Sequence, residues 1–318
     1  MGKNILKESS YAINKAIRIL ESGGLVSVKT ETVYGLACDP SNIYSIKKLY
    51  HTKRRPLLNP LILHVSTLKM LRSISEVGEV SEKVIKNFWP GPLTLILPRK
   101  KSSLILDNAV SGLNTIAVRM PNSKVFLRII NKIGRPLAAP SANQSGYISS
   151  TNAHHVFDSF KKDVDLIINS GQSEYGLEST IIDLSKKKIF LQRPGVIGIE
   201  ELEKKIKLKI YEKKISKNIK PNAPGQLFKH YAPNTPVKLN VKRPSKGEAF
   251  LAFGRNSIDH SPKLNLSING NLKEAAYNLF NFLRKLDKLN KINISVSPIP
   301  QKGIGKAINE RLKRAAYK

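Results

Sequence analysis

Short apolar segments alternate with amphipathic helical patterns along the first two hundred residues, and this alternation predicts an α/β domain. Helices are expected between Ser9 and Gly23, from Ser41 to the basic cluster at 53–55, and near 79–88, 122–132 and 153–160. Strands are expected at 25–29, 61–65, 93–97, 115–118, 136–139, 166–169, 179–184 and 188–192.

The pattern changes near residue 204, where the chain becomes rich in lysine and proline and loses its apolar period. We therefore predict a first domain at 1–205, a linker at 206–236 and a small α/β domain at 237–318. In the last segment, 248–254 and 292–300 are expected strands, and 271–289 and 306–316 are expected helices.

The charge balance is extreme: 54 Lys and Arg against 23 Asp and Glu give a net charge of +31. This charge favours an anionic partner such as a nucleotide, RNA or a lipid surface, although a lysine-rich proteome would give the same excess. The single cysteine, Cys38, excludes an intrachain disulfide and a multi-cysteine metal site. No signal peptide or membrane-spanning run is visible, so a cytoplasmic protein without membrane contact is expected.

Two basic residues, Lys53 and Arg55, precede an apolar run that contains Asn59 and His64. If the segment is extended, residues two apart point the same way, and an ammonium beside a guanidinium suits a triphosphate or a carboxylate. A solvated basic loop is the plain alternative. A histidine inside an apolar run is more often a core residue than a catalytic one.

Polar side chains also stand at the ends of several expected strands, where α/β folds place ligands. In KTETVYGLACD (29–39), Thr32 is a candidate ligand, and an ordinary turn with Gly35 at positive φ is the plain alternative. In APSANQSG (139–146), free backbone N–H groups could hold an oxyanion. The strand-end candidates outside the first of these motifs are Arg119, Ser141, Asn143, Ser179 and Arg193.

Familiar nucleotide and metal motifs are missing. GIGKA (303–307) lacks the first glycine and the final Ser or Thr of a P-loop, and no glycine-rich dinucleotide fingerprint occurs. His154 and His155 lack the spacing of metal ligands, and there is no G-x-S-x-G motif. If ATP binds, it binds without a P-loop.

Taken together, TETVYGL, K-x-R at 53–55, AVRMP, S-x-N at 141–143 and the ST–RPG pair resemble the threonylcarbamoyl-AMP synthases. PGQLFKHYAP (224–233) and GIGKAINERLKRAA (303–316) resemble the long, two-domain form of that family. The resemblance implies a YrdC-like twisted mixed sheet with flanking helices, a linker and a small Rossmann-like C-terminal domain. Ser150 stands where family members often have proline.

The resemblance implies synthesis of L-threonylcarbamoyl-adenylate from L-threonine, bicarbonate and ATP, with release of pyrophosphate, for t6A modification at position 37 of tRNAs. Lys53 and Arg55 are then the expected catalytic cations. The expected threonine ligands are Thr32, His64, Arg119, Ser141 and Ser179. The expected ATP ligands are Arg55, Asn59, Thr115, Asn143, Thr151, Arg193 and Tyr231.

We expect Mg²⁺ to be held mainly by the ATP phosphates, with no dedicated protein metal site and no organic cofactor. The product is expected to pass to the tRNA threonylcarbamoyl transferase machinery, and direct binding of tRNA or double-stranded RNA stays open. Two alternatives remain: a non-catalytic RNA-binding module, favoured by the charge, and related nucleotidyl or carbamoyl transfer by YrdC-like modules, whose usual zinc-finger and acylphosphatase-like segments are absent here.

Overall fold

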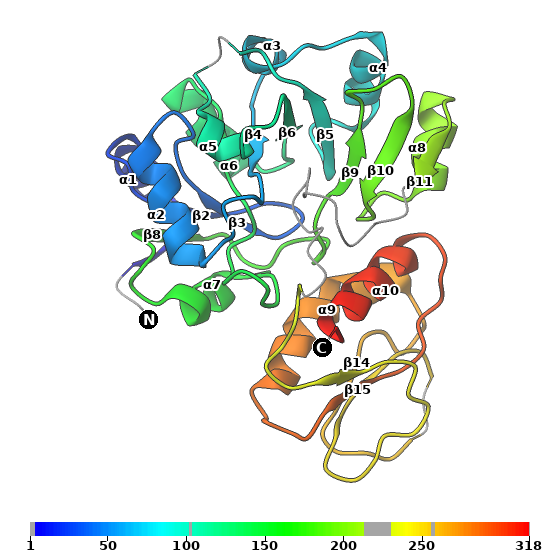
Figure 1. The fold of residues 1–318 in the computed structure, drawn as a ribbon. Helices are drawn as coiled ribbons and strands as arrows, with labels where there is room; N and C mark the ends of the chain where they lie inside the picture. The colour runs from blue at the N-terminus through cyan, green and yellow to red at the C-terminus, as the bar shows by residue number, and fades with distance from the viewer. Residues whose placement is uncertain (1–3, 102–103, 213–229, 256–257, 318) are drawn as a thin grey trace.

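A computed structural model describes residues 4–101, 104–212, 230–255 and 258–317. They form a larger N-terminal part and a smaller C-terminal part (Figure 1), and the expected α/β class is confirmed. Within the described residues no helix has both the length and the apolar character needed to cross a membrane.

The larger part contains two mixed sheets. The first has the strand order β1 (Ile5–Lys7), β8 (Leu166–Asn169), β2 (Val26–Lys29) and β3 (Tyr34–Ala37). The second has the order β11 (Ile210–Glu212), β10 (Ile189–Arg193), β9 (Thr180–Asp183), β5 (Leu93–Pro98), β6 (Thr115–Arg119), β4 (Ile62–His64) and β7 (Leu137–Ala138).

Eight helices of the described chain flank these sheets: α1 (Ser10–Glu21), α2 (Ile43–Lys53), α3 (Leu68–Ile74), α4 (Glu79–Phe88), α5 (Asp107–Val110), α6 (Lys124–Ile133), α7 (Ala153–Phe160) and α8 (Ile199–Ile206). Their starts follow local chemistry. The Ser9 hydroxyl caps α1 by accepting from the Ala12 amide, as its position before the apolar period predicted. Ser123 caps α6 and also donates to the Lys29 carbonyl of β2, which ties the helix to the first sheet.

The two sheets are joined by β3, because isolated bridges pair Gly35 with Ser141 and Cys38 with Ala138. The alternative of an ordinary turn with Gly35 at positive φ is wrong. Gly35 lies within the strand, and a Cβ there would come within 3.2 Å of the Ala139 Cβ. Its role is the close approach of two backbones.

The C-terminal part is a parallel sheet in the order β12 (Val237–Lys238), β15 (Ile294–Val296), β13 (Ala249–Ala252) and β14 (Lys263–Asn265), with helices α9 (Leu272–Asp287) and α10 (Ile304–Ala315). Figure 1 shows both helices between this sheet and the larger part of the molecule. Their apolar faces form a core of their own, which also takes in Ile148, Leu177 and Tyr231. The two parts are therefore packed against each other.

Most of the predicted linker, residues 213–229, lies outside the described residues, including the PGQLFK half of its motif. The described flanks are ordered elements: α8 extends to Ile206, and β11 pairs in parallel with β10 inside the segment predicted as linker. Sequence reasoning missed α3, α5 and α8 and the short strands β1, β3, β11, β12 and β14, which have few residues and no clear period.

Candidate active site

One cavity gathers side chains from several strand ends. All five expected threonine ligands line it: Thr32, His64, Arg119, Ser141 and Ser179. Three expected nucleotide ligands, Arg55, Arg193 and Tyr231, line the same cavity. The parallel pairing of β4 with β6 and of β5 with β9 brings the ends of these strands to one place, although the residues are far apart in the sequence.

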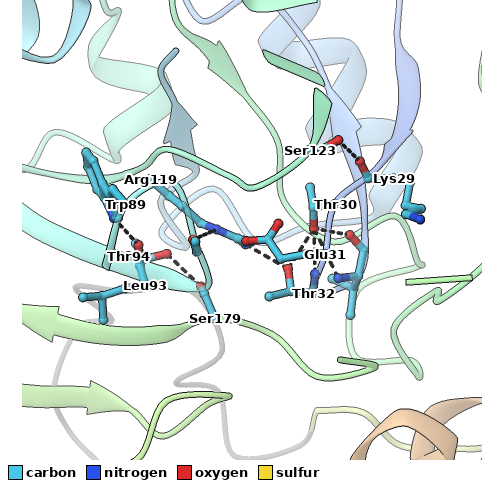
Figure 2. A network of polar contacts seen from close by, with 12 residues as sticks. Lys29, Thr30, Glu31, Thr32, Trp89, Leu93, Thr94, Arg119, Ser123 and Ser179 are labelled. Atoms are coloured by element: carbon cyan, nitrogen blue, oxygen red, sulfur yellow. Dashed lines mark hydrogen bonds and ion pairs between the residues drawn. The ribbon is translucent and has the colours of Figure 1, made fainter. Parts of the chain in front are cut away.

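Arg119 is the best-held cation of the cavity (Figure 2). Its guanidinium donates to the Gly91 carbonyl at 3.0 Å and to the Thr32 hydroxyl at 2.8 Å, and it lies 2.6 Å from a carboxylate oxygen of Glu31. Both charged side chains are buried, so each needs the other. Sequence reasoning expected an anion or carbonyls around Arg119 but missed Glu31.

Thr32 stands at the tip of a tight turn that leads from β2 to β3. The Thr30 hydroxyl donates to the Val33 carbonyl at 2.6 Å and lies 2.8 Å from the Thr32 hydroxyl. The backbone amides of Thr32 and Val33 both donate back to the Thr30 oxygen. This turn fixes the Thr32 hydroxyl against Arg119 without any contribution from a ligand.

Ser179 is fixed from two sides. Its hydroxyl lies 2.7 Å from the Thr94 hydroxyl, a contact that Figure 2 shows. From β10, Arg193 donates to the Ser179 carbonyl at 3.1 and 3.0 Å and to its hydroxyl at 3.1 Å. Burial lowers the pKa of Arg193, yet the guanidinium remains a cation at neutral pH, as arginine does in proteins.

His64 is neutral. It is the last residue of β4 and pairs in register with Arg119. Burial and then the Arg119 charge lower its pKa to about 3. Its Nδ1 atom has no hydrogen-bond partner within the described chain, so the side chain faces the cavity with an unused polar atom.

The helix expected from Ser41 does end at the basic cluster, so Lys53 and Arg55 do not share one extended segment. Lys53 is the last residue of α2, and Arg54 reverses the chain with a φ of 50°. Lys53 is buried and donates to the carbonyls of Ser141 and Asn143, and it does not line the cavity. Burial, then the charge of Arg55, lowers its pKa well below the usual lysine value.

Arg55 does line the cavity, and it is held by the carbonyls of Asn59 at 3.0 Å and Pro60 at 2.8 Å. Burial lowers its pKa to about 10. Neutral carbonyls orient the guanidinium without cancelling its charge, and no acidic side chain of the described residues forms an ion pair with it. Arg55 is therefore a cation ready for an anionic ligand.

Three backbone amides of the loop at 139–146, where the sequence suggested free N–H groups, already donate within the protein. The Ala142 amide donates to the Tyr34 carbonyl, the Asn143 amide to the Ser141 carbonyl, and the Ser145 amide to the Lys53 carbonyl. An oxyanion hole made of these amides is thus ruled out in this conformation. The Ser141 side chain remains at the cavity wall.

Several buried polar atoms have no hydrogen-bond partner among the described residues. They include the side-chain amide of Asn59, the Asn143 side-chain oxygen and the Tyr231 hydroxyl. Of these three residues only Tyr231 lines the cavity, where a polar ligand or water can satisfy its hydroxyl, because buried polar groups are seldom left unpaired. Two unpredicted residues belong here: Glu178 and His230 both line the cavity.

The described residues contain no cluster of three or more histidine, cysteine or acidic side chains that could hold a metal ion. The acids at the cavity are already engaged. Glu178 accepts from Ser149 and Arg311, and Glu31 is paired with Arg119.

Two comparisons of sequence identify the family. Residues 18–195 match a family model described as "Telomere recombination", and residues 197–317 match one described as "Threonylcarbamoyl-AMP synthase, C-terminal domain". The threonylcarbamoyl-AMP synthase of Pyrococcus abyssi is 36% identical over 324 residues, covering 96% of this chain and 94% of that protein. The chain belongs to the threonylcarbamoyl-AMP synthase family. The Bacillus subtilis member is 34% identical over 331 residues, covering 98% of this chain and 94% of that protein.

Solved structures of this family share the two-domain architecture. The crystal structure of Pyrococcus abyssi Sua5 complexed with L-threonine superposes with a TM-score of 0.89 at 34% identity, covering 98% of this chain and 96% of that one. Escherichia coli YciO, 23% identical with a TM-score of 0.55, covers 64% of this chain and shares the fold of the larger part. The resemblance to the long form, drawn from the motifs, is confirmed.

Four expected nucleotide ligands of the threonylcarbamoyl-AMP synthase family do not line the cavity: Asn59, Thr115, Asn143 and Thr151. Thr115 begins β6 and lies on the same face as Arg119, roughly 13 Å away along the strand. Thr151 is buried, with its hydroxyl 3.3 Å from the His155 ring. Asn143 donates to the carbonyls of Gln144 and Tyr147.

Proposed function

We propose that this protein synthesises L-threonylcarbamoyl-adenylate from L-threonine, bicarbonate and ATP, and that the product serves t6A modification of tRNA. The observation that carries the proposal is the cavity itself. Three buried arginines, Arg55, Arg119 and Arg193, line it together with serine and threonine hydroxyls, in a chain of this family. Such a site suits several anionic small molecules held at once.

L-Threonine is expected at the Arg119 end. The relative of known structure was crystallised with L-threonine, and the same fold here presents Arg119, Thr32 and Ser179 on one wall. The guanidinium is fixed by Gly91, Thr32 and Glu31, so a substrate carboxylate would meet it in place and share it with Glu31. Neutral His64 adds a polar atom without repelling the threonine ammonium.

ATP is expected at the Arg55 and Arg193 end, with Tyr231 of the linker as the far wall. Lys53 supports this end by donating to the Ser141 and Asn143 carbonyls. Nearby phosphates would favour its protonated form and so raise its pKa. Mg²⁺ would enter with the nucleotide, because the nearby acids are paired with arginines.

The chemistry needs no covalent enzyme intermediate. The neutral threonine amine attacks CO2 derived from bicarbonate, forms the N–C bond and loses a proton, which gives a carbamate and releases water overall. A carbamate oxygen then attacks the α-phosphorus of ATP, and the bond to the β-phosphate breaks as pyrophosphate leaves with its electron pair. Catalysis rests on positioning and on neutralising the charge of the phosphates.

The decisive experiment is mass-spectrometric detection of threonylcarbamoyl-adenylate after purified protein is mixed with MgATP, bicarbonate and L-threonine. Serine replaces threonine as the control. Product that depends on threonine is the expected result. A folded protein that binds RNA with a steep salt dependence but makes no product would favour the RNA-binding alternative instead. A cytoplasmic location and transfer of the product to a tRNA threonylcarbamoyl transferase stay predictions.

Arg55→Ala tests the nucleotide end. We expect kcat/KM for ATP to fall about a hundredfold, because an interaction of about 2.7 kcal/mol with a phosphate corresponds to two decades in rate. Arg54→Ala is a matched control, since Arg54 is the exposed neighbour and the change in charge is the same. Equal kinetics in the two variants would remove Arg55 from the nucleotide site.

A further inference from the structure

Arg311 links the C-terminal domain to residues of the cavity wall. Arg311 extends from α10 and is fully buried in the larger part of the molecule. Arg311 does not line the cavity. Outside α10, however, every residue that it contacts either lines the cavity or is the sequence neighbour of a residue that lines it. We propose that Arg311 is a positioning residue through which the C-terminal domain sets the shape and charge of the active site; this rests on the proposed function.

Three contacts define the role of Arg311. Its Nε atom donates to a Glu178 carboxylate oxygen at 3.0 Å, and its Nη1 atom donates to the Pro194 carbonyl at 2.7 Å, next to Arg193. Its guanidinium carbon lies 5.2 Å from the centre of the Tyr231 ring. The guanidinium of Arg311 thus fixes the Glu178 carboxylate, the turn at Pro194 and the Tyr231 ring at the cavity wall.

The guanidinium is held in its charged form by this surrounding. Burial opposes the charge, but Tyr231, Glu310 and Glu178 outweigh burial and raise the pKa of Arg311. Glu178 in turn lines the cavity, where an uncompensated carboxylate would repel a triphosphate. Arg311 therefore neutralises an acid that stands beside the expected nucleotide.

A second arginine completes the connection from the other helix of the domain. Arg284 of α9 donates to the carbonyls of Ile148 at 2.5 Å and Ser149 at 3.4 Å. The Ser149 hydroxyl donates to the second oxygen of Glu178. A continuous polar chain thus runs from α9 through Ser149 and Glu178 to Arg311 on α10. Glu178 is thus held directly by Arg311 and indirectly by Arg284, through Ser149 of the larger part.

Tyr231 is fixed by the same helices. Its backbone has a φ of 61°, its ring stacks on Phe280 of α9 at 5.5 Å between centres, and Arg311 lies over the ring. A non-glycine residue holds this conformation only where its surroundings impose it. Without Arg311 we expect the ring to gain freedom at the cavity wall.

The first test follows the Tyr231 ring directly, without reference to activity. The protein is labelled with 3-fluorotyrosine, and the resonance of Tyr231 is assigned with Tyr231→Phe. Arg311→Met should shift and broaden that resonance, whereas Lys313→Ala, an exposed change on the same helix, should leave it in place. An unmoved resonance in folded Arg311→Met would overturn the proposal whatever reaction the protein catalyses.

The second test separates neutralisation from fold. In Arg311→Met we expect kcat/KM for ATP to fall about a hundredfold, the loss that a displacement of about 1 Å can cause, while KM for threonine changes less. Adding Glu178→Gln removes the orphaned carboxylate and should restore activity about tenfold. If Arg311 acted only in folding, Glu178→Gln would not restore activity. A double variant as inactive as Arg311→Met would therefore overturn the charge argument.

Arg311→Lys covers the case in which Arg311→Met does not fold, because it keeps the charge and loses the fork. For Arg311→Lys we expect an intermediate loss of kcat/KM for ATP and no loss for threonine. Wild-type kinetics in this variant would overturn the need for a guanidinium. The wild-type product assay runs in the same series. Absent product there counts against the proposed function, while the fluorine signal still decides the positioning role.

Discussion

Gly195 offers the sharpest test of how the Arg193 turn fits against the start of β9. A Cβ at this position would lie 2.3 Å from the Thr180 nitrogen, 2.5 Å from the Ser179 carbonyl carbon and 2.6 Å from the Glu178 oxygen. All three are backbone atoms, which cannot rotate away as a side chain does. Gly195→Ala must therefore push the turn and the strand apart, by roughly 1 Å to regain ordinary van der Waals contact.

That displacement acts on the site. Arg193 reaches the Ser179 carbonyl at 3.1 and 3.0 Å, and an added ångström takes both contacts beyond hydrogen-bond length. We expect kcat/KM to fall about a hundredfold and the free energy of unfolding to drop by about 1 to 3 kcal/mol, as overpacking does. The protein should still fold at 25 °C.

The assay is threonylcarbamoyl-adenylate formation with urea unfolding in parallel, and the fluorescence of Trp89, the single tryptophan, can report threonine binding. Trp89 donates to the Leu93 carbonyl beside Thr94, which contacts Ser179 (Figure 2). Gly78→Ala is the control, because no atom lies within 4 Å of its added methyl. Wild-type kcat/KM in Gly195→Ala would refute the claim that this contact positions Arg193.

Two further perturbations follow from the same structure. Because His64 is neutral when folded, with a pKa of about 3 against 6.5, the unfolded chain binds the extra proton below pH 6.5. Stability is therefore lost as pH falls, and between pH 7 and 5 the wild type should lose about 2 kcal/mol more than His64→Gln in urea titrations; parallel losses would show that His64 is not neutral in the fold. Gly176→Ala places a methyl 2.6 Å from the Ala276 carbonyl oxygen at a φ of 68°. This variant should have a lower midpoint of thermal unfolding, and its domain contact should be more open to proteolysis. An unchanged melting curve would contradict that packing.

Sequence reasoning found the cations of the cavity because each stands at an expected strand end. Arg119 and Arg193 follow apolar runs whose period is visible locally, and α/β topology then brings strand ends together. The helix expected up to the basic cluster is present as α2 and includes Lys53, so the shared direction that an extended segment would give Lys53 and Arg55 does not apply.

The acids of the site were out of reach for a different reason. Glu31 is interpretable only through Arg119, and Glu178 only through Arg311, which lies 133 residues further along the chain. In the sequence, a buried acidic residue next to a strand cannot be told from a solvated one until the fold shows which cation lies beside it. Gly35 shows the same limit, because its constraint is Ala139 and not its own φ.

The way the cations are held explains why the cavity can accept anions at all. In the contacts described above, Arg55 donates to the carbonyls of Asn59 and Pro60. A neutral acceptor orients a cation and leaves its charge for the ligand, whereas a carboxylate partner would compete with phosphate. The cavity's own carboxylate, Glu178, is instead cancelled from behind by Arg311. Buried cations are also screened little by salt, so we predict that nucleotide affinity depends on the arginines of the cavity and not on the lysine-rich surface.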